Sequence, residues 1–337
     1  MLRADYSLLK FNTMHLDVSA QNFVSIESHD NLIQYITAND WQKPLYILGG
    51  GSNIVFLKDF EGTILHINIH GKEIVKEDEN QVCVKANAGE NWHEFVLWAL
   101  QNDFGGLENL SLIPGKVGAS PMQNIGAYGV EIKDVFEELE AVEISTGKIR
   151  KFNALDCAFG YRESVFKNEL KDKFIITSVT FRLTKKNHKI KTEYGAIQQQ
   201  LAEFHIENPT IQDVSRAVIA IRESKLPHPK EIPNCGSFFK NPTILNEKYH
   251  LLQQEFPGIP GYEVGNGFTK VPAGWLIEKA GWKGFRNETV GVHEKQALVL
   301  INHNHGSGQD IFDLSEMILQ DIKQKFGIKL EREVNII

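Results

Sequence analysis

Residues 113–129 read Ile-Pro-Gly-Lys-Val-Gly-Ala-Ser-Pro-Met-Gln-Asn-Ile-Gly-Ala-Tyr-Gly, a stretch that follows neither the helical nor the strand period. Almost every residue in it is small or supplies a hydrogen-bond donor. Glycines permit positive φ and let backbone amides approach an anion. A diphosphate needs several donors within about 3 Å and no β-carbons in the way. The stretch therefore indicates a phosphate-binding loop, with a tight turn as the alternative.

A second glycine-rich stretch, Gly-Gly-Gly-Ser-Asn at residues 49–53, lies between the apolar runs 46–48 and 54–57. Neither stretch matches the G-x-G-x-x-G or the G-x-x-x-x-G-K-[ST] pattern, so neither a Rossmann nor a P-loop domain is indicated. Each stretch alone is compatible with a simple turn. Together, between strands in one half of the chain, they favour a dinucleotide site.

The elements around these stretches alternate between strands and helices. Asn91 and Glu94 predict the start of a helix, and Gly105-Gly106 predict its end. Residues 243–272 hold several prolines and glycines and are expected to form an irregular insertion. The other expected elements are strands at 63–69, 81–85, 174–183 and 297–301, a hairpin over 139–152 turning at Thr146-Gly147, and helices at 212–224 and 310–326, the last stopped by Gly327. The chain is therefore predicted to have an α+β fold.

Composition restricts the function. Of the 337 residues, 42% are hydrophobic and 23% are charged, which is typical of globular proteins. The net charge of −7 makes a general nucleic-acid binder a poor interpretation. We find no apolar run long enough for a transmembrane helix and no secretory signal. Three cysteines without metal-ligand spacing indicate reduced thiols in the cytoplasm, and His303-Asn304-His305 is expected to face solvent, so no metal site is predicted.

Six segments occur in a fixed order between residues 48 and 334: LGGGSN, GLENLSLIPGKVGASPMQNIGAYGVE, FGYRES, GSFFKNP, AGWLIEKAG and LEREV. In these segments the chain resembles the UDP-N-acetylenolpyruvoylglucosamine reductases, in their longer form with a tyrosine-bearing loop. The resemblance implies an FAD-binding domain of the vanillyl-alcohol-oxidase (PCMH) type in two subdomains, followed by an α+β substrate-binding domain. The expected boundaries are residues 1–70, 71–210 and 211–337.

The resemblance also implies the reaction. Such an enzyme uses FAD and NADPH to reduce UDP-N-acetylglucosamine enolpyruvate to UDP-N-acetylmuramate in peptidoglycan synthesis. Hydride passes from flavin N5 to C3 of the substrate, and a proton reaches C2. The expected partner is this small molecule, with no nucleic acid and no membrane, and the protein is expected to be a cytoplasmic monomer. Two alternatives stay open: another FAD-dependent oxidoreductase of the same fold, and a sugar-nucleotide binding protein without redox activity.

Three residues match the family's catalytic positions. Arg162 carries a permanently charged planar group that can bind a carboxylate and stabilise an enolate. Ser237 matches the proton donor to C2; a serine is a weak acid, but an enolate carbon is a strong base. Glu333 matches the C-terminal glutamate, which stabilises the enolate or helps the proton transfer. Only the family pattern prefers Glu333 over Glu331.

The binding residues also come from the resemblance. Sugar and diphosphate binding is expected at Tyr194, Lys225, Asn241 and Gln296, although a lysine at the end of a helix more often complements the helix dipole. FAD is expected at Gly49, Gly50, Gly51, Ser52, Asn53, Ile54, Pro114, Gly115, Gly118, Ala119, Ser120, Asn124, Gly126 and Ala127, with Gly126 where the backbone approaches the pyrophosphate.

Overall fold

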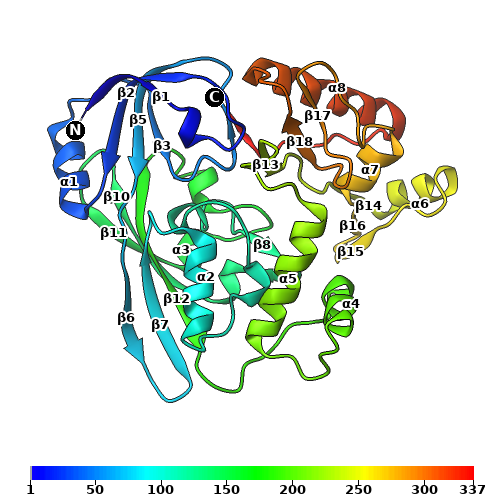
Figure 1. Cartoon of the computed structure of the whole chain (residues 1–337), viewed down its shortest axis with the longest axis horizontal. Coiled ribbons are helices and arrows are strands. Elements are labelled where there is room, and N and C mark those ends of the chain that lie inside the picture. Colours follow the sequence, from blue (N-terminus) through cyan, green and yellow to red (C-terminus); the bar gives the residue numbers. More distant parts are fainter. Residues whose placement is uncertain (1) are drawn as a thin grey trace. The chain divides into compact units, whose positions relative to one another are not determined.

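The computed structural model describes residues 2–337 and divides them into two compact units (Figure 1). The first unit comprises the residues up to Tyr6 together with 20–50 and 61–224. The second unit comprises residues 7–19, 51–60 and 225–337. The expected division at residues 70 and 210 stays a prediction; residues 211–224, which it assigned to the third domain, belong to the first unit.

The first unit contains two sheets (Figure 1). The four-stranded sheet has the order β1-β2-β5-β3, and β3 runs parallel to β5. The five-stranded sheet has the order β11-β10-β12-β7-β6, with every neighbouring pair antiparallel. The strands are β1 (Arg3–Ser7), β2 (Ser19–Ile26), β3 (Leu45–Leu48), β5 (Phe60–Ile67), β6 (Lys72–Glu77), β7 (Gln81–Asn87), β10 (Phe136–Glu143), β11 (Ile149–Asn153) and β12 (Phe174–Thr184).

Helices cover these sheets through apolar faces. Helix α2 (Trp92–Gln101) packs on the five-stranded sheet, because Trp92 and Phe95 lie against Phe181 with ring centroids 5.7 and 5.2 Å away. Helices α4 and α5 share a separate small core. The remaining elements of this unit are α1 (His29–Ala38), α3 (Ala154–Cys157), α4 (Gly195–Glu203), α5 (Ile211–Lys225), β8 (Gly126–Ala127), β9 (Val130–Glu131) and four 3-10 turns, η2 (Glu108–Leu110), η3 (Val117–Ala119), η4 (Ile132–Asp134) and η5 (Val165–Lys167).

The second unit contains a three-stranded sheet, β13-β18-β17, with α8 packed on it, and a smaller sheet, β14-β16-β15, beside α6 (Figure 1). Near the end of the chain, β19 runs parallel to β4. The elements are η1 (Leu9–Phe11), β4 (Ile54–Val55), β13 (Asn234–Ser237), β14 (Thr243–Leu245), α6 (Asn246–Glu255), β15 (Tyr262–Gly265), β16 (Phe268–Lys270), α7 (Ala273–Lys279), β17 (Val290–Val292), β18 (Val299–Asn302), α8 (Gly308–Phe326) and β19 (Asn335–Ile336).

Local signals predicted several helices correctly. Asn91 caps α2 by accepting a hydrogen bond from the Glu94 amide. Gly327 ends α8 in the left-handed conformation, with φ 61°. The predicted end of α2 at Gly105-Gly106 is wrong: the helix ends at Gln101, because Asp103 takes the left-handed conformation (φ 57°) and the Phe104 amide donates back to the Ala99 carbonyl (2.9 Å).

The prediction of an irregular insertion at 243–272 is also wrong, since this segment forms the β14-β16-β15 sheet and α6. Its strands are only three or four residues long, and α6 buries only Tyr249 and Leu252, so neither period is visible in the sequence. The structure also contains α1 and α4, which the sequence analysis did not predict. The expected α+β fold class is confirmed.

The three cysteines are free and buried. Over residues 2–337, no helix combines the length and the apolar character needed to cross a membrane.

Gly51 shows how strongly one glycine constrains the second unit. Its φ is 63°, and a β-carbon there would lie 1.9 Å from the Phe11 carbonyl oxygen. We expect Gly51→Ala to lower the free energy of unfolding by well over the roughly 1–2 kcal/mol that a left-handed residue alone costs. Gly258 is a matched control, because its φ is 92° and a β-carbon there has no neighbour within 4 Å. Chemical denaturation measures the free energy of unfolding of both variants. An equal or smaller loss of that free energy in Gly51→Ala than in Gly258→Ala would contradict the prediction.

Candidate functional site

The glycine-rich stretch 113–129 lies in the first unit, pressed against the end of β7. The Val117 amide donates to the Glu90 carbonyl (2.9 Å), and the Gly118 amide donates to the Ala88 carbonyl (3.0 Å). A β-carbon on Gly118 would lie 2.5 Å from the Ala88 β-carbon. Gly118 is therefore required for this stretch to pack closely on residues 88–90.

The first unit also brings the two glycine stretches together. A β-carbon on Gly50 would lie 3.1 Å from Gly115 Cα, which is closer than most real β-carbon contacts. A β-carbon on Gly49 would touch only the Lys116 stem, at 3.8 Å. Gly49, Gly50 and Gly115 therefore form a backbone surface without side chains, and Lys116 lies beside it. A β-carbon at these positions would fill the space. Such a surface fits the diphosphate of a dinucleotide.

Not every expected FAD residue has a free amide. The amides of Gly118, Ala119 and Ser120 donate to protein carbonyls, and the Ser120 hydroxyl donates to the Val117 carbonyl (2.7 Å). A cofactor held by this stretch therefore takes its amide donors from other residues. Pro114 is exposed and Ala127 lies in the short strand β8.

Asn124 is fully buried, and its side-chain amide is engaged with protein groups. Its Nδ2 donates to the Glu131 carboxylate (2.9 Å) and to the Gly160 carbonyl (3.0 Å), and its Oδ1 accepts from the Lys133 amide (3.1 Å). The side chain thus ties the glycine stretch to the loop that carries Arg162.

Gly126 contacts the same loop. The Arg162 guanidinium donates to the Gly126 carbonyl (2.6 Å), and a β-carbon on Gly126 would lie 2.8 Å from the Val130 carbonyl oxygen and 3.1 Å from Arg162 Nη1. Packing against protein groups therefore already requires glycine at this position, which is a different reason from the expected approach of a pyrophosphate.

Arg162 itself has a left-handed backbone, with φ 56°. A non-glycine residue pays roughly 1–3 kcal/mol for such a conformation, so the surrounding structure must enforce it. The Lys167 ammonium holds the Arg162 carbonyl (3.1 Å), and Gly160 and Glu163 exchange backbone hydrogen bonds across the turn. The side chain is consequently presented from a rigid loop.

Ser237 and Glu333 are brought together in the second unit. The Glu333 amide donates to the carbonyl of Phe238, the residue after Ser237 (2.9 Å), and the Lys240 amide donates to the Glu331 carbonyl (2.9 Å). The segments 237–240 and 331–333 therefore lie side by side. Ser237 is exposed, whereas Phe238 and Phe239 are buried with 0% and 1% exposure.

The end of the glycine stretch 49–53 supports this pair. The Asn53 side chain donates to the Glu333 carbonyl (3.2 Å), and the Asn335 amide donates to the Asn53 carbonyl (3.1 Å). Ile54 pairs with Asn335 in the β4–β19 ladder, and Ser52 is partly exposed. Asn53 therefore fixes the backbone of the expected catalytic glutamate.

The two candidate glutamates differ in environment. The Glu331 side chain is 69% exposed and lies 3.7 Å from the Lys240 ammonium, whereas Glu333 is only partly exposed. The two glutamates lie two positions apart on one extended segment, yet their side chains differ in exposure to solvent. The structure thereby supplies a physical difference that the sequence lacked.

Asn241 and Gln296 meet at the start of α7. Asn241 Oδ1 accepts from the Ala273 amide (2.9 Å), and a β-carbon on Gly274 would lie 3.5 Å from Gln296 Oε1. Lys225 is the exposed last residue of α5. Tyr194 precedes α4 and is 53% exposed.

Sequence reasoning missed two residues beside Tyr194. The Tyr128 ring meets the Tyr194 ring edge-on, with centroids 5.2 Å apart, and the Tyr128 hydroxyl is hydrogen-bonded to Arg222. Burial lowers the pKa of the Arg222 guanidinium and raises the pKa of Tyr128. One signal in the sequence could have pointed to Arg222: it lies three residues before the expected binding residue Lys225, at the end of the same predicted helix.

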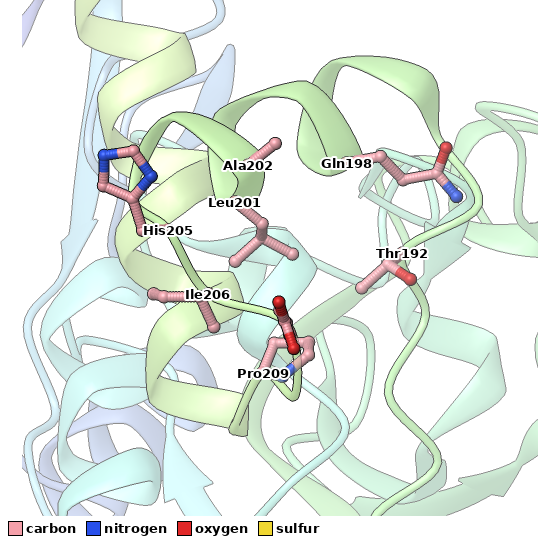
Figure 2. A pocket seen from close by; sticks show the side chains of 8 residues that line it. Thr192, Gln198, Leu201, Ala202, His205, Ile206 and Pro209 are labelled. Atoms are coloured by element: carbon pink, nitrogen blue, oxygen red, sulfur yellow. The ribbon is translucent and has the colours of Figure 1, made fainter.

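A cavity of about 460 Å³ lies elsewhere in the first unit, beneath the end of α4 (Figure 2). Thr192, Leu201, His205 and Pro209 are among its lining residues. None of the predicted site residues lines this cavity, so we do not assign the candidate active site to it.

Two family models match the chain. The model of an FAD binding domain matches residues 20–153, and the model of the C-terminal domain of UDP-N-acetylenolpyruvoylglucosamine reductase matches residues 228–337. The predicted FAD-binding domain is thereby confirmed.

Relatives and a solved structure extend the match over the whole chain. The UDP-N-acetylenolpyruvoylglucosamine reductases of Flavobacterium johnsoniae and Amoebophilus asiaticus are 51% and 46% identical to it, each covering 100% of this chain and 99% of the relative. The crystal structure of the Thermus caldophilus reductase covers 100% of this chain and 99% of its own, with 21% identity and a TM-score of 0.67, and it shares the fold. The chain belongs to the UDP-N-acetylenolpyruvoylglucosamine reductase family.

Proposed function

We propose that this chain is an FAD-dependent reductase that converts UDP-N-acetylglucosamine enolpyruvate to UDP-N-acetylmuramate for peptidoglycan synthesis, with Arg162, Ser237 and Glu333 as its catalytic residues. The observation that best supports these roles is the pairing of segments 237–240 and 331–333, which joins the expected proton donor to the expected glutamate. We also infer that the protein is a cytoplasmic monomer; the three free, buried cysteines support a reducing compartment.

The glycine stretches and Lys116 would hold FAD through its diphosphate. When bound, FAD supplies hydride for C3 of the substrate, and NADPH restores the reduced cofactor. The reaction leaves negative charge on C2 and the conjugated carboxylate. The protein must therefore stabilise an enolate and deliver one proton.

Arg162 binds and stabilises that enolate carboxylate. Its guanidinium keeps its charge and offers several donors in a plane. The hydrogen bond to the Gly126 carbonyl fixes one of its nitrogens and thereby the direction of the group. Because the donors are oriented before the charge develops, little reorganisation is needed in the transition state.

Ser237 delivers the proton to C2. Its position at the end of β13 leaves the hydroxyl exposed, and Gly236, with φ 75° and no atom within 4 Å of its missing β-carbon, lets a ligand approach. Glu333, held through its backbone by Phe238 and Asn53, orients the enolate or assists this proton transfer. Tyr194, Lys225, Asn241 and Gln296 bind the sugar nucleotide.

Gly49 tests the FAD surface without disturbing the protein. A β-carbon there makes only ordinary contact with Lys116, so Gly49→Ala should fold normally. If the backbone must approach the FAD diphosphate, losing one hydrogen bond to a charged group should weaken FAD binding about 10- to 150-fold. The measurement is the dissociation constant for FAD by flavin fluorescence. Gly195→Ala, also with open space around its β-carbon, serves as the control, and equal FAD affinity in both variants would refute the assignment of Gly49.

Ser237→Ala should separate the two half-reactions. Reduction of the bound cofactor by NADPH forms no enolate, so its rate should stay near that of the wild type. Reoxidation by the enolpyruvyl substrate should slow by roughly 10²–10⁴-fold, the usual range for a positioned acid. Ser237→Cys should keep part of the activity, because a thiol can donate a proton. Stopped-flow absorbance follows both steps, and a defect confined to reduction by NADPH would make Ser237 a binding residue.

Glu333→Gln and Glu331→Gln form a matched pair. Both changes remove a charge and preserve shape, but only Glu333 lies beside the Ser237 segment with a partly buried side chain. We expect Glu333→Gln to slow reoxidation by the substrate by at least about tenfold, at the lower end of the effect of losing a catalytic carboxylate. Glu331→Gln should change it little. The same stopped-flow measurement decides, and the opposite order of effects would transfer the role to Glu331.

A further inference from the structure

Arg332 lies between the two candidate glutamates, and its side chain is bound to helix α8. Its Nε donates to the Ser315 hydroxyl (2.8 Å), and one of its terminal nitrogens donates to the Glu316 carboxylate. Its guanidinium carbon lies 4.6 Å from the centroid of the Phe312 ring. These three partners share one face of α8, because they lie at helical spacings of three and four positions. The guanidinium is therefore held at three points of one element.

This anchor is largely withdrawn from water. The Arg332 side chain is 18% exposed, and Ser315 is fully buried. The Ser315 hydroxyl donates its single proton to the Phe312 carbonyl (2.6 Å), so its oxygen is oriented to accept from Arg332. Hydrogen bonds to a charged group are strong, and partly buried charges are screened less than exposed ones. The Arg332 side chain thus has a defined direction.

The backbone carries this direction to Glu333. Arg332 pairs with Phe239 in an antiparallel bridge, between the two backbone hydrogen bonds that join the Glu333 segment to its neighbour. Consecutive side chains along an extended segment point to opposite faces. With Arg332 directed at α8, Glu331 and Glu333 therefore project from the other face. Glu331 agrees with this, since its carboxylate lies 3.7 Å from the Lys240 ammonium on the neighbouring segment.

The other contacts of this segment constrain the side-chain direction less. The Glu333 carbonyl accepts from the Asn53 side chain (3.2 Å), which holds the backbone. Leu330 and Val334 are buried, with 2% and 5% exposure, but apolar burial is non-directional. A planar guanidinium with several partners is directional. Arg332 therefore supplies the orienting side-chain contact.

We propose that Arg332 is a positioning residue for the reductase reaction and acts through Glu333. Its attachment to α8 sets the direction from which the Glu333 carboxylate approaches the reacting carbons of the substrate. Loss of the attachment should slow the reaction, because a small misplacement of a catalytic group is costly. The inference rests on the proposed function, which supplies the role of Glu333.

The test uses the FAD-loaded protein and follows both half-reactions by stopped-flow absorbance. Arg332→Met removes the planar group and keeps most of the stem. Arg332→Lys keeps the charge but not the fork of donors. Lys325→Met is the control, because Lys325 also pairs with a carboxylate of α8, Asp321 (2.9 Å), but in the last turn of the helix.

We expect Arg332→Met to slow reoxidation at saturating substrate by about tenfold, and by no more than Glu333→Gln, since misplacement costs at most what the group contributes. Reduction by NADPH, the affinity for FAD and the KM for the enolpyruvyl substrate should stay near the wild-type values. Arg332→Lys should recover part of the rate, and Lys325→Met should match the wild type. The double variant Arg332→Met/Glu333→Gln should be no slower than Glu333→Gln alone, because residues that act as a unit are not additive.

A merely structural role would give different results. Loss of FAD affinity, equal slowing of both half-reactions, additive effects in the double variant, or wild-type reoxidation in Arg332→Met would each overturn the proposal. Melting temperatures show whether Arg332→Met folds; if it does not, Arg332→Lys and Glu316→Gln carry the same comparison, with partial slowing of reoxidation as the expected result. If Glu333→Gln leaves reoxidation unchanged, the proposed role of Glu333 fails instead, and this inference fails with it.

Discussion

The first unit depends on the contact between the glycine stretch 113–129 and the end of β7. Gly118 lies so close to Ala88 that no side chain fits between them. The backbone amides of Val117 and Gly118 bond to residues 88–90, and the Lys116 ammonium adds a hydrogen bond to the Gly89 carbonyl (2.8 Å). Because the stretch cannot shift, the groups along it have fixed positions. Gly126 receives the Arg162 guanidinium, Asn124 holds the Arg162 loop, and further along the same backbone the Tyr128 hydroxyl bonds to Arg222. One packing constraint thus determines where the first unit presents its cations.

In the second unit, strand-like backbone pairing fixes the positions of the candidate site residues. Ser237 is exposed, so the buried Phe238 and Phe239 that follow it and the paired segment 331–333 determine its position. The Asn53 side chain completes this arrangement by bonding to the Glu333 carbonyl. A residue that the sequence assigned to FAD thereby also supports the expected catalytic glutamate, since a single amide side chain can bond to the backbone and still present its other groups.

Electrostatics explains why an acidic chain is suited to anionic ligands. The net charge is −7, yet Arg222 and Lys116 are partly buried without an ion-pair partner among residues 2–337. Burial lowers the pKa of Lys116 as well, with Glu90 and Glu94 opposing the effect. Cations that are removed from water but not neutralised interact strongly with an arriving phosphate, because the surrounding dielectric is low. Surface carboxylates, which are solvated and screened, compete little with them.

The sequence by itself determined the helices α2, α5 and α8, the hairpin β10–β11 and the family, because caps, turns, periodicity and motif order are local properties. It also named Arg162, Ser237 and Glu333 as candidates, through motifs rather than through physics. Only the tertiary structure decided that 243–272 is a sheet with a helix, since its short strands depend on their neighbours for stability. Tertiary packing likewise distinguished the exposed Glu331 from Glu333. It also hydrogen-bonded the Asn124 side chain to the Gly160 carbonyl and left the Arg222 Nε without a hydrogen-bond partner. Burial and hydrogen-bond partners come from residues far apart in the chain, so no local pattern could have predicted them.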